Sequence, residues 1–187
     1  MNIGFAMCGS FCTFSQVFSA MEAIAKEHTV IPIFSFNSQT LDSRFGTARE
    51  HLARAEEICG RPVLKTIPDV EPIGPKGLLD VLVIAPCTGN TLGKLANGIA
   101  DTPVTMAAKS HLRNGKPLVI AVSTNDALSG AAENIGRLLN RRHIYFVPFG
   151  QDDPIKKPTS MVADFSKIPQ TVQFAFEGKQ IQPILFS

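Results

Sequence analysis

The residues best suited to chemistry directly follow a central apolar run, residues 81–85. An apolar run of this length, bounded by proline and glycine, is typical of a strand that is covered on both faces, as in a parallel sheet. Loops at the carboxyl ends of such strands bind ligands in open α/β sheets. The loop here precedes a helix predicted to begin near Thr91, and its hydroxyls, amide and backbone N–H groups suit a phosphate or the polar edge of a heterocycle. The candidate residues are Thr88, Gly89, Asn90 and Thr91.

The first strand–helix turn is a second candidate anion site. It follows a strand predicted at residues 3–7 and reads CGSFCT. Gly9 would let the backbone approach a phosphate, and Ser10 or Thr13 could donate a hydrogen bond to it. The turn lacks the G-x-G-x-x-G pattern, so it does not predict a dinucleotide site. The alternative is that Ser10 or Thr13 caps an ordinary helix.

Two further strand ends carry small polar residues. After the second strand, a ring could lie against an aromatic side chain, although a local turn is the alternative. After the strand at 118–122, an asparagine could orient a ligand, but asparagine in loops often serves local hydrogen bonding. The candidate residues are Ser35, Phe36 and Asn37 at the first of these ends and Ser123 and Asn125 at the second.

A polar loop at residues 148–158 contains an adjacent pair of lysines, Lys156 and Lys157. Such a pair is commonly a solvated surface feature, and the alternative is an anion clamp for a dicarboxylate. The four histidines are scattered along the chain, and none has a cysteine or carboxylate partner at a spacing that predicts a catalytic triad.

Strand and helix patterns alternate along the chain. We predict strands at 3–7, 28–36, 63–67, 81–85, 118–122 and 144–147, and helices at 14–27, 47–59, 91–98, 102–114, 129–141 and 160–177. This alternation predicts a three-layer, doubly wound parallel sheet of the Rossmann or flavodoxin-like kind. Pro32 predicts an edge or bulged position in the second strand. Ser129 is the expected N-cap of its helix, and Pro169 is expected to interrupt or bend the last one.

Composition limits the classes of function. The chain has 187 residues, 44% of them hydrophobic, and a net charge of +2. We expect one domain over 1–187, with a C-terminal tail from about 178, and no nucleic-acid surface. No apolar run approaches the roughly 20 residues that span a bilayer, and no secretion signal is recognisable, so we expect a cytoplasmic protein without a membrane partner. The four cysteines are typical of reduced thiols and predict no metal site.

Three motifs in this order resemble the HFCD flavoproteins, the family of flavin-dependent cysteine decarboxylases. CGS at 8–10 resembles the T-G-S turn that contacts the flavin phosphate in that family. APCTGNT at 85–91, continuing as LANGIAD at 95–101, resembles its A-P-x-S-A-N-T…I-A-x-G-x-x-D segment. Residues 117–128 resemble its P-x-x-x-A-P-A-M-N-x-x-M stretch, with Asn125 on the family's asparagine. The likeness extends from residue 1 to about 165.

Three departures from the family pattern concern its chemistry. Decarboxylating members carry a histidine about eight residues before the aspartate that precedes the central strand. Here that aspartate is Asp80, and residues 71–73 contain no histidine. VST at 122–124 replaces Pro-Ala-Met, and FGQDDPIKKP at 149–158 replaces the late loop that contains a cysteine. The missing base and thiol argue against decarboxylation of a cysteine substrate.

One branch of the family is similar over the whole chain, including KKPTSMVADF and the Ser-Thr-Asn-Asp loop. That resemblance implies one of the two subunits of an enzyme, the other being a dehydrogenase-like subunit that carries NADP. Together they would oxidise dihydrodipicolinate, a small dicarboxylate, to aromatic dipicolinate in the mother-cell cytoplasm of a sporulating bacterium. Family members form trimers or dodecamers, so the resemblance also implies a homo-oligomer. The alternatives are a non-catalytic scaffold with a vestigial flavin pocket and a stand-alone FMN-dependent decarboxylase.

The resemblance also implies a role for each candidate residue. Gly9, Ser10 and Phe11 would hold the FMN phosphate. Ser35, Phe36 and Asn37 would hold the ribityl chain or the phosphate, and residues 88–91 would meet the edge of the flavin ring. Ser123 would lie beside the ring. Asn125 would orient a substrate carboxylate, and Lys156 or Lys157 would neutralise one.

Overall fold

The strands form one mixed sheet, and the carboxyl ends of its parallel strands lead into the candidate loops. The computed structural model describes residues 1–186. The strand order is β2-β1-β3-β4-β7-β6, and β5 also pairs with β4. The pairs among β1–β5 are parallel, whereas β7 is antiparallel to both β4 and β6. The predicted α/β fold is confirmed. The prediction of a wholly parallel sheet was wrong at the edge formed by β7 and β6. The strands are β1 Asn2–Met7, β2 Thr29–Phe34, β3 Val81–Cys87, β4 Leu118–Thr124, β5 Ile144–Phe146, β6 Phe149–Gly150 and β7 Met161–Ala163.

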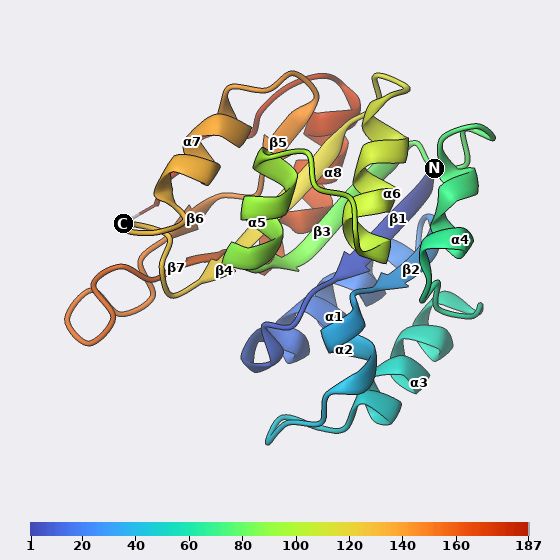
Figure 1. The fold of residues 1–187 in the computed structure, drawn as a ribbon, viewed down its shortest axis with the longest axis horizontal. Coiled ribbons are helices and arrows are strands. Elements are labelled where there is room, and N and C mark those ends of the chain that lie inside the picture. The colour runs from blue at the N-terminus through green and yellow to red at the C-terminus, as the bar shows by residue number, and fades with distance from the viewer. Residues whose placement is uncertain (187) are drawn as a thin grey trace.

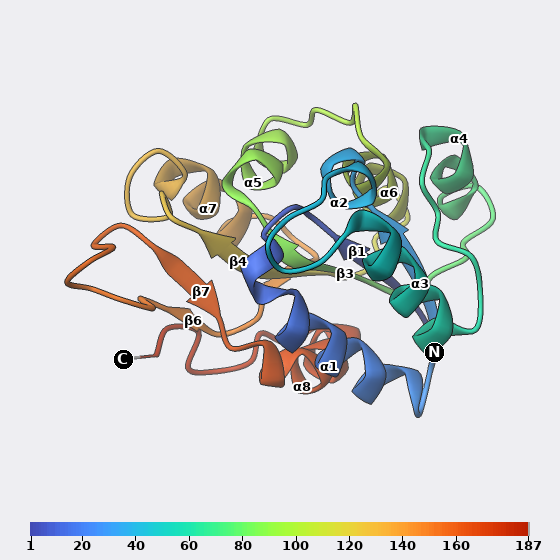
Figure 2. The same ribbon diagram turned by 90° about the horizontal axis from the view of Figure 1, so that it is seen from below.

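Helices cover both faces of the sheet, so the predicted three-layer arrangement is confirmed (Figures 1 and 2). Helices α1 and α8 lie on one face, and α5, α6 and α7 lie on the other. The helices are α1 Phe14–Ala25, α2 Phe36–Thr40, α3 Ala48–Cys59, α4 Ile67–Val70, α5 Gly89–Ala96, α6 Pro103–Leu112, α7 Ala132–Leu139 and α8 Ile168–Phe176, with 3-10 turns at Phe11–Thr13, Glu71–Ile73 and Phe165–Lys167.

The central strands are buried from end to end. Every residue of β3 is buried, as are the first six residues of β4. Helices on both faces remove these apolar side chains from water, which is the main favourable term in folding. The largest fully buried side chains are aromatic and come from both halves of the chain: Phe5, Phe14, Phe18, Phe34, Phe146 and Phe165. The apolar run at 81–85 is therefore the central buried strand, as predicted.

Pro32 lies in the edge strand β2, as predicted, but without a bulge. The pairing with β1 runs in unbroken register from Asn2↔Thr29 to Met7↔Phe34. The Pro32 carbonyl faces the outer edge, where it accepts a hydrogen bond from the Leu64 N–H at 2.9 Å. The missing proline N–H faces the same outer edge, so no bond to β1 is lost. The prediction of a strand at 63–67 was wrong, because only one bridge forms there, between Ile33 and Leu64.

Two predicted helix starts were also wrong. Helix α7 begins at Ala132, and the Ser129 hydroxyl donates to the Asp126 carbonyl within the preceding turn instead of capping the helix. Helix α8 begins at Ile168, because β7 and a 3-10 turn occupy the first part of the segment expected to be helical. Pro169 lies in the first turn of α8, where its missing N–H has no helical partner to lose. Proline starts this helix and does not bend it.

Residues near the C-terminus lie along β6. The Phe149 N–H donates to the Ile184 carbonyl at 3.0 Å, and Phe149 pairs with Leu185. Gly150 lies so close to this segment that a Cβ there would be 2.6 Å from the Phe186 carbonyl oxygen. Within residues 1–186, no helix has the length and apolar content needed to cross a bilayer.

Candidate functional site

Three adjacent strand ends meet at one pocket. Because β2, β1 and β3 are neighbours and parallel, their carboxyl ends lie at the same edge of the sheet. The pocket there has a volume of about 310 Å³, at the lower end of the ~300–1,000 Å³ that small-molecule sites occupy. We call it the strand-end pocket, and it is lined by Cys8, Gly9, Ser35, Phe36, Asn37, Thr88, Asn90, Thr91, Lys94 and Thr102. Seven of the predicted cofactor-binding residues are therefore brought together.

The loop between β3 and α5 supplies the centre of the pocket. The strand continues to Cys87, and α5 begins at Gly89, earlier than predicted, with Thr88 as its N-cap. The Thr88 hydroxyl accepts a hydrogen bond from the Thr91 N–H at 3.4 Å. Asn90 is exposed at the start of α5. This donor set, of hydroxyls, an amide and the N-terminus of an eight-residue helix, fits an anion or a heterocycle edge.

Gly89 does not line the strand-end pocket, but it allows two loops to pack closely. A Cβ at Gly89 would lie 2.6 Å from an Asp126 carboxylate oxygen and 2.8 Å from the Thr124 hydroxyl. Both of these residues belong to the end of β4 and the turn after it. Glycine therefore lets the loop after β3 lie directly against the loop after β4.

The first turn joins the strand-end pocket to the end of β4. Gly9 lines the pocket, whereas the Ser10 hydroxyl is hydrogen-bonded to the Ser123 hydroxyl at 2.8 Å. The Thr13 hydroxyl donates to the Ser10 carbonyl at 2.8 Å, and neither Ser10 nor Thr13 caps a helix through its side chain. The alternative of an ordinary cap was therefore wrong. Phe11 packs on Phe14, with ring centres 5.2 Å apart, outside the pocket lining.

Cys8 lies beneath this turn and is fully buried. Burial raises the pKa of its thiol to about 11, and hydrogen bonds from Thr91 and Thr88 oppose that rise. The Thr91 hydroxyl donates to the Cys8 sulfur at 3.3 Å. At neutral pH this residue is therefore a thiol and a poor nucleophile, so it contributes packing and a weak hydrogen bond to the pocket wall.

At the end of β2, Ser35 has a structural role and the Phe36 ring is exposed. Ser35 caps the short helix α2 by accepting a hydrogen bond from the Ser38 N–H at 3.3 Å, so a capped helix follows the strand where a local turn was the alternative. Phe36 lines the pocket and is 45% exposed. Its ring is therefore accessible to a ligand, although the Ser35 hydroxyl is already engaged.

Asn125 is hydrogen-bonded to the loop between β6 and β7. Because β7 pairs with the end of β4, this loop folds back over residue 125. The Thr159 hydroxyl donates to the Asn125 carbonyl at 2.7 Å, and the Ser160 hydroxyl donates to the Asn125 side-chain oxygen at 3.4 Å. The antiparallel edge thus brings Asn125 next to the loop that contains the lysine pair.

The two lysines in this loop differ in their partners. Lys157 forms a salt bridge with Asp152 at 3.0 Å, and that hydrogen bond and charge raise the lysine pKa. The Lys156 backbone N–H donates to the Asp153 carboxylate at 2.9 Å, and its side chain has no carboxylate within 4.0 Å among residues 1–186. Both are exposed. Lys156 is therefore the one with a free charge.

Lys94 and Thr102 line the strand-end pocket but were missed in the sequence. The Lys94 ammonium donates to both carboxylate oxygens of Asp101, at 2.8 and 2.9 Å. This bond holds the pKa of Asp101 below its usual range. The signal was present, because Lys94 lies four residues after Asn90 and so shares its helix face. Asp101 and Thr102 follow in the loop before α6.

The strand-end pocket can bind and orient a ligand, but it offers no strong base. Within residues 1–186, neither a histidine nor a carboxylate lines it. Nor do the described residues include a group of three histidine, cysteine or acidic side chains that could hold a metal ion. The groups present are hydroxyls, amides, a thiol, an aromatic ring and one lysine. Their chemistry is recognition through hydrogen bonds and stacking.

Comparisons with known proteins agree with this geometry. The model of the family described as Flavoprotein matches residues 2–175. The dipicolinate synthase B subunit of Bacillus subtilis (strain 168) is 46% identical over 185 residues, which cover 98% of this chain and 92% of that one. The crystal structure of the dipicolinate synthase B subunit from Bacillus halodurans has a TM-score of 0.91 and 43% identity, and covers 100% of this chain and 96% of that one.

A more distant structure shares the fold alone. The crystal structure of the FMN-dependent cysteine decarboxylase SpaF has a TM-score of 0.69 and 20% identity, and covers 95% of this chain and 97% of that one. The predicted family is therefore confirmed by a match over nearly the whole length of the chain. The chain belongs to the flavoprotein family.

Proposed function

We propose that this chain is the FMN-binding B subunit of a dipicolinate synthase, an oxidoreductase. With the dehydrogenase-like A subunit of that enzyme it would oxidise dihydrodipicolinate to dipicolinate during sporulation. The name of the Bacillus subtilis relative supports the enzyme, and the family supports a flavin. The observation that carries the proposal is the strand-end pocket, because seven residues selected by family motifs and strand-end patterns line one cavity.

The pocket residues fit FMN by the chemistry of their donors. The first turn and the start of α5 would hold the phosphate and the edge of the ring with backbone N–H groups, hydroxyls and the Asn90 amide. The exposed Phe36 ring would lie against the ribityl chain or the phosphate side, next to Ser35 and Asn37. Ser123 would lie beside the ring, held in place by its hydrogen bond to Ser10.

Oxidation of the dihydro ring to the pyridine removes a hydride and a proton from the substrate. A bound flavin supplies a hydride acceptor. Asn125 would orient one substrate carboxylate, and the free ammonium of Lys156 would neutralise the charge of a substrate carboxylate. Lys157 could do so only by giving up its salt bridge with Asp152. Because no base lines the pocket within the described residues, the proton would pass to water or to a group on the dehydrogenase-like subunit.

The assembly in this proposal has two further parts. The dehydrogenase-like subunit would carry NADP and accept electrons, as the designation of the relatives as B subunits and the resemblance to their branch suggest. The chain would also form a homo-oligomer, a trimer or a dodecamer, as family resemblance implies. We place it in the cytoplasm of the mother cell, as one domain over 1–187 with a tail from about 178.

The first test is the visible spectrum of the pure chain after addition of excess FMN and desalting. We expect a retained band near the ~450 nm maximum of flavins. When dihydrodipicolinate and the dehydrogenase-like subunit are added, anaerobic bleaching of that band should accompany formation of dipicolinate. If no flavin is retained, with or without that partner, the redox role is wrong and the scaffold alternative takes its place. Release of CO₂ from a cysteine peptide would instead support the decarboxylase alternative.

Lys94 should contribute to FMN binding through its charge. Lys94→Met removes the pocket's lysine and is expected to raise the Kd for FMN about tenfold, about 1.4 kcal/mol, while riboflavin, which lacks the phosphate, binds as before. Asp101→Asn leaves the ammonium without its carboxylate partner, so FMN binding should become tighter. Quenching of flavin fluorescence measures both. Equal losses of FMN and riboflavin in Lys94→Met would show that Lys94 acts on the pocket's shape and not on the phosphate.

A further inference from the structure

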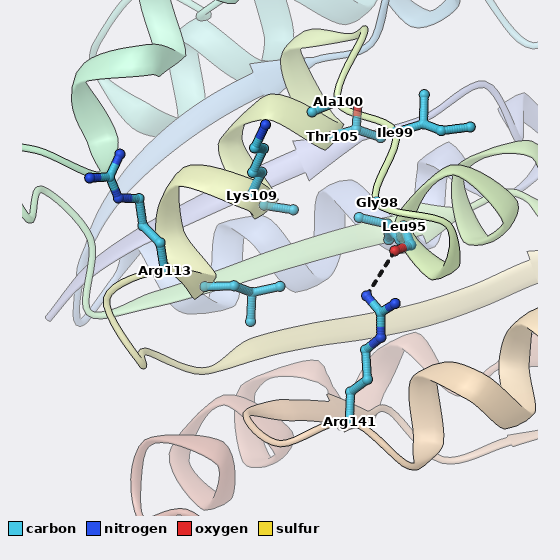
Figure 3. Close-up of a pocket in the computed structure, with 10 residues that line it drawn as sticks. Leu95, Gly98, Ile99, Ala100, Thr105, Lys109, Arg113 and Arg141 are labelled. Atoms are coloured by element: carbon cyan, nitrogen blue, oxygen red, sulfur yellow. Dashed lines mark hydrogen bonds between the residues drawn. The ribbon is translucent and has the colours of Figure 1, made fainter.

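A second pocket lies between α5 and α6, outside the lining of the strand-end pocket (Figure 3). Its volume is about 400 Å³. Its apolar wall includes Leu95, Ile99 and Leu112, and Ile99 is 47% exposed. Three cations, Lys109, Arg113 and Arg141, also line it, whereas no acidic residue of the described chain does. We call it the α5–α6 groove.

Arg141 is part of the structure of this groove. Its guanidinium donates to the Leu95 carbonyl at 3.1 Å and to the Ala96 carbonyl at 2.7 Å, and Figure 3 shows it reaching toward Leu95. These carbonyls belong to the last turn of α5, where a cation satisfies free acceptors and opposes the negative end of the helix dipole. Arg141 therefore already has partners and forms one wall.

Lys109 and Arg113 have no such partners. They lie four residues apart at the end of α6, and their side chains are exposed. Among residues 1–186, neither has a carboxylate within 4.0 Å. Like charges at this spacing repel each other by a few tenths of a kcal/mol, so the pair lowers the stability of the isolated helix. A cation pair beside an apolar wall is complementary to an apolar side chain flanked by carboxylates.

We propose that the α5–α6 groove docks the dehydrogenase-like subunit, through an apolar side chain of that protein flanked by acidic residues. This inference rests on the proposed function for the existence of the partner. A two-fold contact between copies of this chain would place Lys109 and Arg113 against the same cations, whereas the head-to-tail contact of a trimer is tested by light scattering below. The chain as a whole is also positive, with a net charge of +2.

The groove shares a loop with the strand-end pocket. Gly98–Ala100 line the groove, whereas Asp101 holds Lys94 in the wall of the strand-end pocket and Thr102 lines that pocket directly. Helix α5 is also shared, because Leu95 faces the groove and Asn90 faces the strand-end pocket. A partner that docks in the groove therefore contacts the loop next to the candidate flavin site. This position suits a protein that exchanges electrons with that site.

The test is a pair of charge reversals with the same change in net charge. Lys109→Glu/Arg113→Glu is expected to weaken binding of the purified dehydrogenase-like subunit tenfold or more, about 1.4 kcal/mol, in a titration at low salt. Lys26→Glu/Arg49→Glu, on exposed positions of α1's end and α3, should change it less than about twofold. Lys109→Arg/Arg113→Lys should keep binding. Wild-type binding should weaken as salt is raised.

Three results would overturn the docking proposal. One is that Lys109→Glu/Arg113→Glu binds the dehydrogenase-like subunit as tightly as the wild-type chain does, and another is that the wild-type chain does not bind it. The third is that light scattering gives a lower molar mass for that variant than for the wild-type chain when the partner is absent. That result would make the groove a contact between copies of this chain. FMN retention, measured in the same samples, keeps the two proposals separate. If flavin is not retained but the charge reversal still abolishes binding of the partner, the docking surface stands without the redox role.

Discussion

Replacing Asn90 with leucine is expected to raise the Kd for FMN about tenfold to a hundredfold. The amide of Asn90 lies at the strand-end pocket, and its side chain makes no hydrogen bond to another described residue. If it bonds to the edge of the flavin ring, its loss removes that bond and leaves a polar ring atom without a partner, which costs about 1–3 kcal/mol. Quenching of flavin fluorescence on titration measures the change.

The matched control is Asn140→Leu. Like Asn90, Asn140 is exposed. It lies directly after α7 and outside the lining of the strand-end pocket. Both variants should show the circular dichroism and urea midpoint of the wild-type chain, because neither removes a side-chain contact that stabilises the fold. A Kd that stays the same in both variants would remove Asn90 from the flavin site and would place the ring edge elsewhere in the pocket.

A loss of stability in mild acid is expected from His111. This residue is 1% exposed, and its ring is hydrogen-bonded to the Pro117 carbonyl at 2.9 Å. Burial lowers the pKa of His111 from 6.5 to about 4, with the nearby Lys116 acting in the same direction. The unfolded chain therefore binds the proton more tightly than the folded chain. Stability that is present above pH 6.5 should fall by about 3 kcal/mol by pH 4.

The measurement is urea unfolding of the wild-type chain and of His111→Gln between pH 7.5 and pH 4. Glutamine can still donate to the Pro117 carbonyl but does not titrate. Carboxylates titrate in both proteins, and burial also lowers the pKa of His51 in both, so these contributions cancel in the difference. The variant should be less stable than the wild-type chain at pH 7 and should lose less on acidification. Parallel pH profiles of the two proteins would show that protonation of His111 does not cause the loss.

Local sequence patterns predicted the parts of this protein whose partners are close in the chain. The apolar run at 81–85 had to be buried on both faces, because five consecutive apolar side chains alternate between the two sides of a strand. The helix predicted at 47–59 forms at Ala48–Cys59, and Gly60 ends it with a positive φ of 63°. These signals depend on backbone geometry within a few residues, so one sequence is enough to recognise them.

The same kind of pattern found most of the strand-end pocket. Parallel strands place their carboxyl ends at one edge, so polar residues after separate strands converge without any need to know their side-chain contacts. Gly9, Phe36 and Asn90 were selected in this way, and they line one cavity. Lys94 was missed because a lysine on a helix is usually solvated, and its salt bridge depends on Asp101, across a loop whose path the pattern does not specify.

Tertiary structure alone decided the far edge of the sheet and everything that depends on it. Strands β6 and β7 have two and three residues, too short for a periodic signal, and they form because β7 completes the hydrogen bonds at the end of β4. That pairing brings the lysine loop to Asn125. The loop after β1 reaches past β3 to the end of β4, where Ser10 is hydrogen-bonded to Ser123. The sequence by itself determined the family, the layers and the motif residues of the pocket. The contacts among loops came only from the folded chain, because hydrogen bonds between distant segments form where the sheet places their backbones.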